Sequence, residues 1–307
     1  GNSFFLKVVR KCFWHIFKNE FNDKILHESK ILQPQFCVVY KGDQVEPQTL
    51  LELKSHGIYL ILFYPDVSMY DHGPRIPKCL PLYDHIFTTK SYGLNDIRGK
   101  VDSARIDLLH HGFDPDVHRH LDLDADSLQL MGCDVAFIGT WSPKKERYLA
   151  GVAEHLPGID MRIWGNQWNK STTPALRSHI VGVPLFGDLY AYALQASVIT
   201  IALLSERRPG SNSGDLATSR TFNIPACEGF MLHERTDEVL EFYEEGKEIA
   251  CFGSPDELAE KITYYLNHPD ERETIRLAGH KRCIAENSLD SRAQAILDHF
   301  LSRRAAD

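Results

Sequence analysis

The chain has 307 residues, of which 43% are hydrophobic and 25% are charged, and its net charge is −8. This is the composition of an ordinary globular protein, and it excludes a collagen-like, coiled-coil or broadly disordered chain. Residues 1–120 are close to neutral, so the acidic excess lies in the rest of the chain, which argues against a general nucleic-acid-binding protein because such a protein needs a basic face.

The first part of the chain predicts alternating helices and strands. Residues 4–30 carry apolar side chains at helical spacing, and a second helix is expected over 45–57, with Pro in its first turn and Gly at its end. A further helix is expected between the last two strands. Strands that alternate with helices in this way predict parallel βαβ units. The expected strands are 34–42, 58–66, 82–90 and 105–115.

A second series of strands and helices follows an acidic segment, 121–130, which we interpret as a linker between two domains, 1–128 and 129–307. Two such series predict an α/β protein with two Rossmann-like domains facing each other across a cleft, and ligands of such sheets bind beyond the carboxyl ends of the strands. We expect the last helix to pack back on the N-terminal domain. The expected strands are 134–142, 160–165, 198–205, 230–234 and 248–254, and the expected helices are 144–158, 187–197, 220–229, 237–246, 255–269, 270–286 and 289–304.

Cysteine spacing and hydropathy indicate the cellular compartment in which the protein is expected. The seven cysteines are scattered and never spaced CxxC, which predicts free thiols in a reducing cytoplasm and no structural zinc site. No run of 18 apolar residues is present, so no segment is expected to span a bilayer. We expect the aromatic face of residues 4–18 to pack in the core, and the basic residues beside it leave peripheral membrane contact as an alternative.

The strongest cluster of candidate binding residues lies in 205–228. A loop that contains Arg207 and Arg208 leads into the expected start of a helix at Arg220. Backbone N–H groups at a helix N-terminus, hydroxyl groups and arginine all favour a bound phosphate. The alternative is an ordinary helix cap followed by a surface arginine.

Two stretches, 134–149 and 219–282, resemble the CgeB-like glycosyltransferases of the group-1 family, which have the GT-B fold. The family pattern has a strand that ends in Phe-x-Gly-Thr, an Arg, Tyr and Leu on the next helix, and a later Arg-x-Phe-Glu-Ile-Pro-Ala-Cys-Gly stretch. The matching residues here are Phe137, Gly139, Thr140, Arg147, Tyr148, Leu149, Arg220, Phe222, Ile224, Pro225, Ala226, Cys227, Gly246, Lys247 and Glu248.

This resemblance implies that the second domain binds a nucleotide-diphosphate sugar. Arg220 and the backbone of Thr218, Ser219 and Thr221 would face the diphosphate. Gly139, Thr140 and Trp141 would lie under the donor, where a side chain at the glycine would obstruct the approach of the backbone. Trp164 and Trp168 could stack on the base or sugar, or they could instead be rim aromatics that close the core.

Three positions depart from the pattern of the family. The wider superfamily has two Glu residues separated by seven positions that contact the donor sugar and the ribose, and Asp215 and Asn223 stand in their place. Asn223 can bond a ribose hydroxyl but supplies no carboxylate. Glu228 stands where the family usually has Gly.

The resemblance implies a hexosyltransferase that acts with retention, and a glycan, lipid-linked or protein acceptor. Arg207 or Arg208 together with Arg220 could offset the charge of the leaving diphosphate, so we expect no metal and no cofactor besides the donor. Asp66, at the exit of the most apolar strand, is the candidate for the acceptor side, with an ordinary turn residue as the alternative. A degenerate nucleotide-sugar-binding or scaffold protein and a GT-B nucleotide-sugar epimerase are the competing hypotheses.

The start of the chain is unusual for this family. GT-B N-terminal domains usually open with a strand and a Gly-rich turn, whereas this sequence begins almost directly at the helix over 4–30. We therefore expect an N-terminal domain without that first strand, either as a short variant or because a preceding piece is missing from this sequence.

Overall fold

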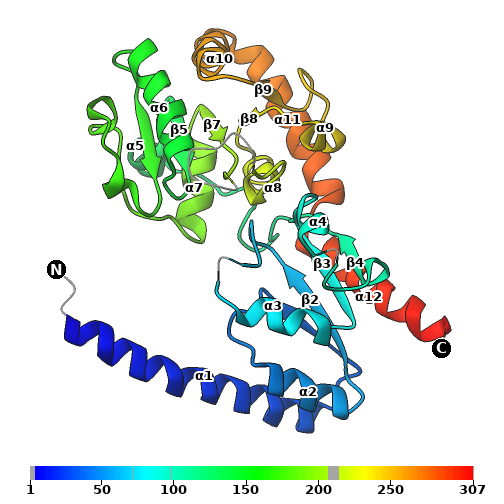
Figure 1. Cartoon of the computed structure of the whole chain (residues 1–307). Helices are drawn as coiled ribbons and strands as arrows, with labels where there is room; N and C mark the ends of the chain where they lie inside the picture. The colour runs from blue at the N-terminus through cyan, green and yellow to red at the C-terminus, as the bar shows by residue number, and fades with distance from the viewer. Residues whose placement is uncertain (1–3, 71, 98, 207–213, 307) are drawn as a thin grey trace. The chain divides into compact units, whose positions relative to one another are not determined.

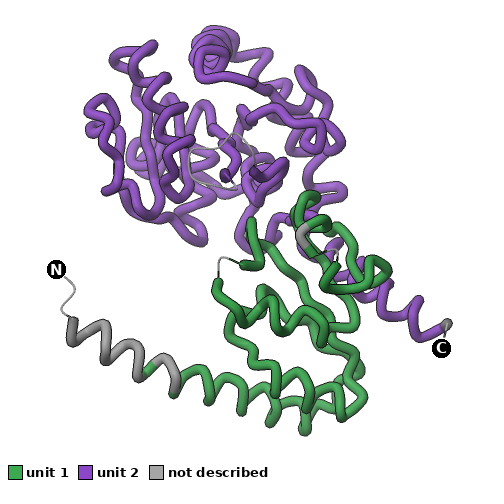
Figure 2. Tube along the Cα trace, viewed as in Figure 1, with its two compact units in different colours: residues 1–109 green, residues 110–307 purple. Residues whose placement is uncertain are grey.

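The computed structural model describes residues 4–70, 72–97, 99–206 and 214–306. Its contacts divide the chain into two compact units, residues 1–109 (unit 1) and 110–307 (unit 2), which Figure 2 colours separately. This division falls earlier than the domain boundary expected after residue 128, which stays a prediction, as do the cleft and the packing of the last helix on the N-terminal domain.

Unit 1 contains a four-stranded parallel sheet in the order β1-β2-β3-β4 (Figure 1). All four strands lie within the ranges that the sequence predicts. β2 is apolar and five of its six residues are buried, as expected for a strand that is covered on both faces. Among the described residues, a helix precedes β1. The elements are α1 (Phe4–Leu32), β1 (Phe36–Tyr40), α2 (Pro47–Ser55), β2 (Tyr59–Tyr64), α3 (Arg75–Cys79), β3 (His85–Thr88), α4 (Gly93–Ile97) and β4 (Ile106–Leu108).

The second half of α1 contacts the rest of unit 1, where Ile25 and Leu26 pack against the core, whereas Phe13, Ile16 and Phe17 are exposed. The buried Asn22 donates from Nδ2 to the carbonyl oxygen of Gln44 (3.0 Å) and accepts a hydrogen bond from the Thr49 hydroxyl (2.7 Å). The expected core packing of residues 4–18 is therefore wrong for the apolar side chains described there. None of the described helices combines the length and the apolar character needed to cross a membrane. The exposed apolar side chains of α1 include Phe13, Ile16, Phe17 and Phe21.

Unit 2 contains a five-stranded parallel sheet in the order β6-β5-β7-β8-β9. β5 is followed in the chain by β6 on one side, and β7 then pairs on its other side, so the direction of winding reverses at β5. Its five strands also lie within the predicted ranges. The elements are α5 (Ala125–Met131), β5 (Val135–Ile138), α6 (Pro143–His155), β6 (Met161–Trp164), α7 (Asp188–Ala196), β7 (Ile199–Ala202), α8 (Ser219–Ala226), β8 (Met231–Glu234), α9 (Asp237–Phe242), β9 (Ala250–Phe252), α10 (Pro255–Asn267), α11 (Pro269–Glu286) and α12 (Leu289–Ala306).

Two segments near the join of the units differ from the sequence-based expectation. The acidic stretch 121–130, expected as a linker, contains most of α5, which begins after Asp124, whose carboxylate accepts the backbone N–H of Ser127 (2.7 Å). The strand expected over 105–115 ends at Leu108 as β4. The residues that follow Leu109 belong to unit 2, where loop contacts hold them.

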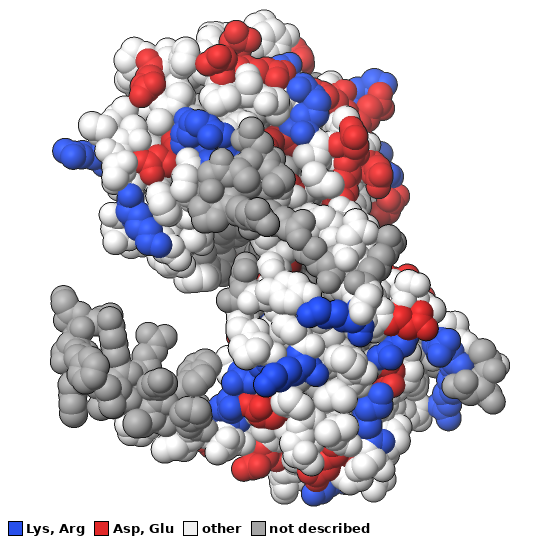
Figure 3. All heavy atoms as spheres, in the orientation of Figure 1, with Lys and Arg blue, Asp and Glu red and all other residues white. Residues whose placement is uncertain are grey.

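Two further features are the placement of charged side chains on the surface and the state of the cysteines. Acidic side chains gather on unit 2 over α9 and α10, while cationic and acidic side chains are mixed on the visible face of unit 1 (Figure 3). The six cysteines whose side chains the structure describes are free thiols, and five of them are buried, in agreement with the expected absence of disulfides at these positions.

Candidate functional site

A pocket of about 360 Å³ lies in unit 2 at the carboxyl edge of its sheet. Its walls come from the turns after β5 and β6, from residues 184–187, from α7 and from the start of α8. This is where the winding of the sheet reverses, and open parallel sheets bind ligands at such points. The volume is in the range of small-molecule sites. We call it the switch-point pocket.

Two glycines allow the turns after β5 and β6 to approach closely. Gly165 has φ +134°, and a Cβ at this position would lie 2.1 Å from the carbonyl oxygen of Gly139. A Cβ on Gly139 would lie 2.9 Å from the Phe137 ring and 3.1 Å from the Arg220 guanidinium. Both turns therefore require glycine. Gly139 and Thr140, which the sequence predicts as donor-binding residues, line the pocket.

Arg220 lines the same pocket from the first turn of α8. Its Nη2 donates to the carbonyl oxygen of Leu203 (2.6 Å), and its guanidinium carbon lies 5.7 Å from the centre of the Phe137 ring. Its buried Nε finds no partner among the described residues. Burial lowers the pKa of Arg220, and Tyr190 and Asp215 oppose this shift. The guanidinium is thus held in place in the pocket wall by Leu203 and Phe137.

The other residues predicted around the start of α8 form two groups. Ser219 and Asn223 line the pocket, and the buried Oδ1 of Asn223 has no partner among the described residues. Thr221 is fully buried, and its hydroxyl oxygen accepts the backbone N–H of Thr218 (3.0 Å) and lies 2.9 Å from Nε2 of His233. The Thr221 side chain therefore fixes the start of the helix, and neither threonine lines the pocket.

A buried lysine that the sequence analysis did not single out lies beside this pocket. Lys145, in the first turn of α6, donates from Nζ to the carbonyl oxygen of Thr140 (3.2 Å) and to the hydroxyl of Ser205 (3.2 Å). Burial, and next the charge of Arg220, lower the pKa of Lys145 to about 7, against the opposing effect of Asp215. Arg220 lines the pocket, and Lys145 lies behind Thr140, close enough for the charge of Arg220 to act on it.

The sequence contains a signal for this lysine, but that signal is ambiguous. Lys144 and Lys145 both follow the Gly-Thr turn after β5. In the structure, Lys144 forms an ion pair with Glu234 (2.6 Å), whereas Lys145 contacts neutral oxygen atoms. The two lysines differ because they point in different directions from the helix. The sequence alone does not show which of them lies beside the pocket.

Asp215 does not line the pocket. It is buried, and its charge raises the pKa of both Lys145 and Arg220, which places it close to both cations. Its role is therefore to balance part of their charge. The predicted residues Arg207 and Arg208 lie outside the described residues.

The tryptophans predicted near the donor belong to the framework of the site. Trp164 is buried in the core at the end of β6. Trp168 is also buried, and its Nε1 donates to the carbonyl oxygen of Gly139 (2.9 Å). Trp141 donates from Nε1 to Glu146 (2.6 Å). None of these three residues lines the switch-point pocket as the structure describes it.

Glu146 connects the turn after β5 to the loop at residues 171–173. Besides Trp141, it accepts hydrogen bonds from the hydroxyl of Ser171 and from the backbone and hydroxyl of Thr173, all between 2.7 and 3.0 Å. Burial acts to raise the pKa of Glu146, but the hydrogen bonds, above all from Thr173 and Trp141, lower it to about 2.

A Glu146→Gln substitution is expected to reduce the free energy of unfolding at pH 7 by about 1.5 kcal/mol, because charge-assisted hydrogen bonds become neutral ones and one acceptor becomes a donor. Because the folded-state pKa lies below the model-compound value of 4.5, the contribution of Glu146 is present above pH 4.5 and is lost as the pH falls towards 2. Urea unfolding across pH tests this, with the exposed Glu154→Gln on the same helix as control. A difference that persists unchanged down to pH 2 would contradict the assignment.

Comparison with known protein families matches residues 144–298 to the glycosyl transferase-like family. The match covers half of the chain. The chain belongs to this family. The matched region contains Lys145 and Arg220 and all of α7 and α8. A comparison with curated proteins found no match.

Solved structures with a similar fold include a glycosyltransferase from Rickettsia africae (14% identity, TM-score 0.64, covering 91% of this chain and 79% of the other). HepE of Anabaena in complex with UDP-glucose is similar with 12% identity and TM-score 0.64, over 86% of this chain and 78% of the other. A candidate UDP-N-acetylglucosamine 2-epimerase from Listeria monocytogenes has 12% identity and TM-score 0.55, over 94% and 80%. These likenesses show that the two parallel-sheet units of this glycosyltransferase-like chain have the GT-B fold.

Asp66, the residue predicted for the acceptor side, lies in unit 1 just after β2. Its Oδ2 lies 2.7 Å from Nζ of Lys41 and 2.8 Å from Nε2 of His72. The hydrogen bond to Asp66 raises the pKa of Lys41. Lys41 follows β1, so the carboxyl ends of two neighbouring strands bring the acid and its partners together. In this glycosyltransferase-like protein Asp66 is thus a paired carboxylate rather than an isolated base.

Proposed function

We propose that the protein transfers a hexosyl group from a nucleoside-diphosphate sugar to an acceptor hydroxyl, with retention and without a metal ion. The observation that supports this most is Arg220 in the wall of the switch-point pocket at the start of α8, with Lys145 hydrogen-bonded to the neighbouring Thr140. When the bond between the anomeric carbon and the diphosphate breaks, negative charge grows on the leaving group, and fixed cations offset it. Retention rests on the resemblance to the CgeB-like group-1 enzymes.

Independence from metal is proposed from the chemistry of the pocket wall. The described residues that line the switch-point pocket include one histidine, His118, and no carboxylate. Hard cations such as Mg²⁺ are held by carboxylates and carbonyl oxygens. A diphosphate placed here would meet Arg220 directly, with Asp215 buried behind the cations.

The apolar part of the pocket wall suits a nucleoside. Pro184, Leu185 and Phe186 form an apolar rim, and Phe186 is 74% exposed. A flat base can lie against such a rim while Asn223, with its unpartnered oxygen, takes a hydroxyl of the ribose. Because HepE was solved with UDP-glucose, uridine donors are the first to test.

The acceptor is proposed to be a glycan, a lipid-linked sugar or a protein, received by unit 1 through Asp66 with its partners. The exposed Phe13, Ile16 and Phe17 on α1 support a peripheral membrane contact of a cytoplasmic protein. Sedimentation with anionic vesicles at low and high salt tests that contact, and its absence at low salt would rule it out.

A thermal-shift screen against UDP, GDP, TDP, ADP and CDP sugars tests the proposed function, because a ligand that binds only the folded state raises the Tm. One nucleotide class should raise it clearly, and the same donor should then release free sugar slowly in the absence of acceptor. No shift with any of these donors would contradict the proposal.

Two competing functions have their own support. The likeness to the Listeria protein favours a nucleotide-sugar epimerase, which would convert UDP-N-acetylglucosamine into its 2-epimer, a change that proton NMR detects. Asp215 and Asn223 in place of two glutamates favour a binding protein without turnover. Tight donor binding without hydrolysis, epimerisation or transfer across a broad acceptor panel would favour this last function.

A further inference from the structure

The chain enters unit 2 through residues 110–121, which we call the connector. Its start is fastened by backbone hydrogen bonds of Phe113, whose N–H donates to Asn287 (2.9 Å) and whose carbonyl oxygen accepts from Leu289 (2.7 Å). Its end is fastened by Gln195 on α7. The Gln195 side chain pairs with both backbone polar groups of Leu121, accepting its N–H on Oε1 and donating from Nε2 to its carbonyl oxygen, each at 3.0 Å.

The middle of the connector forms part of the switch-point pocket. Val117 and His118 line it. Nδ1 of His118 accepts the backbone N–H of Asp114 (3.0 Å), and its ring lies edge-on to Tyr190 with ring centres 5.6 Å apart. The position of this wall therefore depends on where the connector is held at its two ends.

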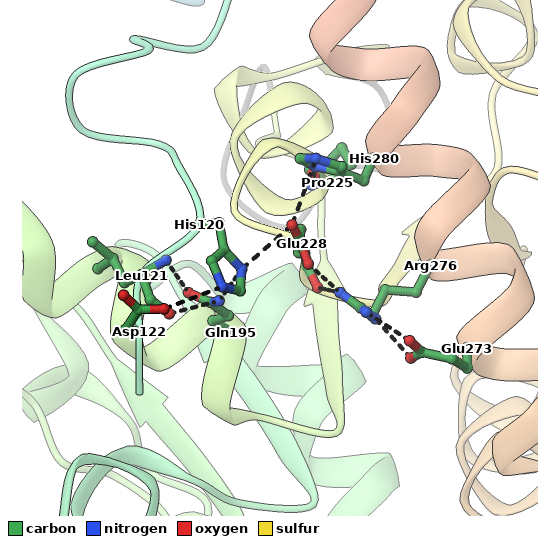
Figure 4. Close-up of polar contacts among 9 residues, drawn as sticks. All are labelled: His120, Leu121, Asp122, Gln195, Pro225, Glu228, Glu273, Arg276 and His280. Carbon is green, nitrogen blue, oxygen red and sulfur yellow. Dashed lines mark hydrogen bonds and ion pairs between the residues drawn. The ribbon is translucent and has the colours of Figure 1, made fainter. Parts of the chain in front are cut away.

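Glu228 gives the connector a further attachment, shown in Figure 4. Its Oε1 lies 3.3 Å from Nδ1 of His120, a nitrogen that also lies 2.7 Å from Nε2 of Gln195. The same Oε1 lies 3.6 Å from Nε2 of His280, and Oε2 lies 3.0 Å from Nη1 of Arg276. Arg276 is also paired with Glu273 (2.7 Å). One carboxylate thus joins the connector, the turn after α8 and helix α11.

The backbone at Glu228 makes this side chain unexpected. Its φ is +57°, a left-handed conformation that glycine adopts easily and other residues adopt at a cost. The glutamate at this position contacts three basic side chains, which glycine would not do.

This cluster lies away from the pocket that it would influence. Glu228 precedes β8 and Gln195 lies just before β7, so both are at the amino edge of the sheet, whereas the switch-point pocket is at the carboxyl edge. The connector reaches from one edge to the other within a few residues, with His118 in the pocket and His120 against Glu228.

We propose that Glu228 is a positioning residue, which holds the end of the connector through His120 and thereby keeps Val117 and His118 in the wall of the switch-point pocket. The effect on nucleotide binding rests on the proposed function, whereas the attachment of the connector does not. The two parts can therefore be tested separately on the same variants of the full chain.

The connector carries a natural protease site at Arg119, which is half-exposed. In Glu228→Gly we expect trypsin to cut after Arg119 roughly fivefold faster than in the wild-type protein, because cleavage follows the population of the released segment. In Glu228→Gln, which keeps an oxygen for Arg276, the rate should be intermediate. Glu273→Gln is the matched control, since it removes the other partner of Arg276 and leaves His120 untouched, and its rate should be that of the wild type.

Affinity for UDP, measured by calorimetry, should fall by roughly threefold or more in Glu228→Gly and stay unchanged in Glu273→Gln. Unchanged cleavage at Arg119 in both Glu228 variants would overturn the proposal. Faster cleavage with unchanged UDP affinity would overturn the connection to the pocket. If UDP does not bind the wild-type protein, the proposed donor fails, while the cleavage rates still decide whether Glu228 holds the connector.

Discussion

An Arg220→Ala variant is expected to bind a nucleoside diphosphate about 10- to 100-fold more weakly than the wild-type protein, the loss that corresponds to a hydrogen bond with a charged group. Arg220 lines the switch-point pocket, its guanidinium is fixed by Leu203 and Phe137, and its Nε lacks a partner among the described residues. A fixed donor has little conformational freedom left to lose on binding, so its removal costs the full interaction. Titration calorimetry with UDP measures this directly.

Two further variants separate binding from folding in that experiment. Arg220→Lys keeps a positive charge but loses the planar fork, so we expect it to recover part of the affinity. Arg177→Ala removes an exposed arginine of unit 2 that does not line the pocket, and its affinity should be that of the wild type. Equal affinity of wild-type and Arg220→Ala protein, with both folded by circular dichroism, would remove Arg220 from the site.

The strands were predictable because a strand that is buried on both faces appears in the sequence as a continuous apolar run. Parallel strands covered by helices are continuous apolar runs, such as Leu60 to Phe63 in β2 and Val135 to Ile138 in β5. Each of the nine described strands falls within its predicted range. The alternation with helices then predicts parallel pairing, which all the described strand pairs confirm.

The segments predicted wrongly have no such continuous apolar run. Helix α1 has apolar residues at helical spacing, but spacing alone does not tell which part of the helix is covered. Asn22, Ile25 and Leu26 make the contacts, and the aromatic residues before them are exposed. Helix α5 is short and acidic, and it is begun by the local cap of Asp124, a signal that also occurs in turns. Residues 110–115, expected as the end of a strand, include Gly112 and Pro115 and are held by loop contacts to residues 287–292.

The candidate site was predictable where backbone chemistry dominates. Gly139 and Arg220 stand at the ends of elements that the sequence locates well, and both line the pocket. The sequence does not show that Trp141 has a structural role rather than a binding role. That role depends on its hydrogen bond to Glu146, and no motif in the sequence marks Glu146 as its partner. The role of Glu228 depends on contacts with residues that are distant in the chain, such as His120 and Arg276.

Lys145→Met is expected to weaken UDP binding about tenfold or more at pH 6.5 and to have no effect on it at pH 9. Burial and the charge of Arg220 lower the pKa of Lys145 to about 7, so in the free protein the lysine is charged at the lower pH and largely neutral at the higher one. A diphosphate favours the charged form and therefore takes up a proton as it binds. The affinity of the wild-type protein should accordingly fall as the pH rises above about 7.

Calorimetry in two buffers with different ionisation enthalpies measures that proton uptake at pH 8. On binding UDP, the wild-type protein should take up a large fraction of a proton. Lys145→Met should lose this uptake, because the group that is protonated is missing. Lys144→Met is unsuitable as a control because it would break the ion pair of the partly buried Glu234. Lys170→Met, an exposed change on the same unit, serves instead. Equal proton uptake by wild-type and Lys145→Met protein would show that Lys145 does not contact the anion.

Stability provides an independent check on the same lysine. Its folded-state pKa lies below the unfolded value of 10.5, so the unfolded chain binds more protons between about pH 7 and 10.5, and the contribution of Lys145 to stability rises with pH over that window. Below pH 7 the buried charge opposes folding, and methionine, of similar length, relieves this cost. Lys145→Met should therefore be at least as stable as the wild type at pH 6.5 although it binds UDP less well. A residue retained for the stability of the fold would show the opposite, with stability and affinity falling together.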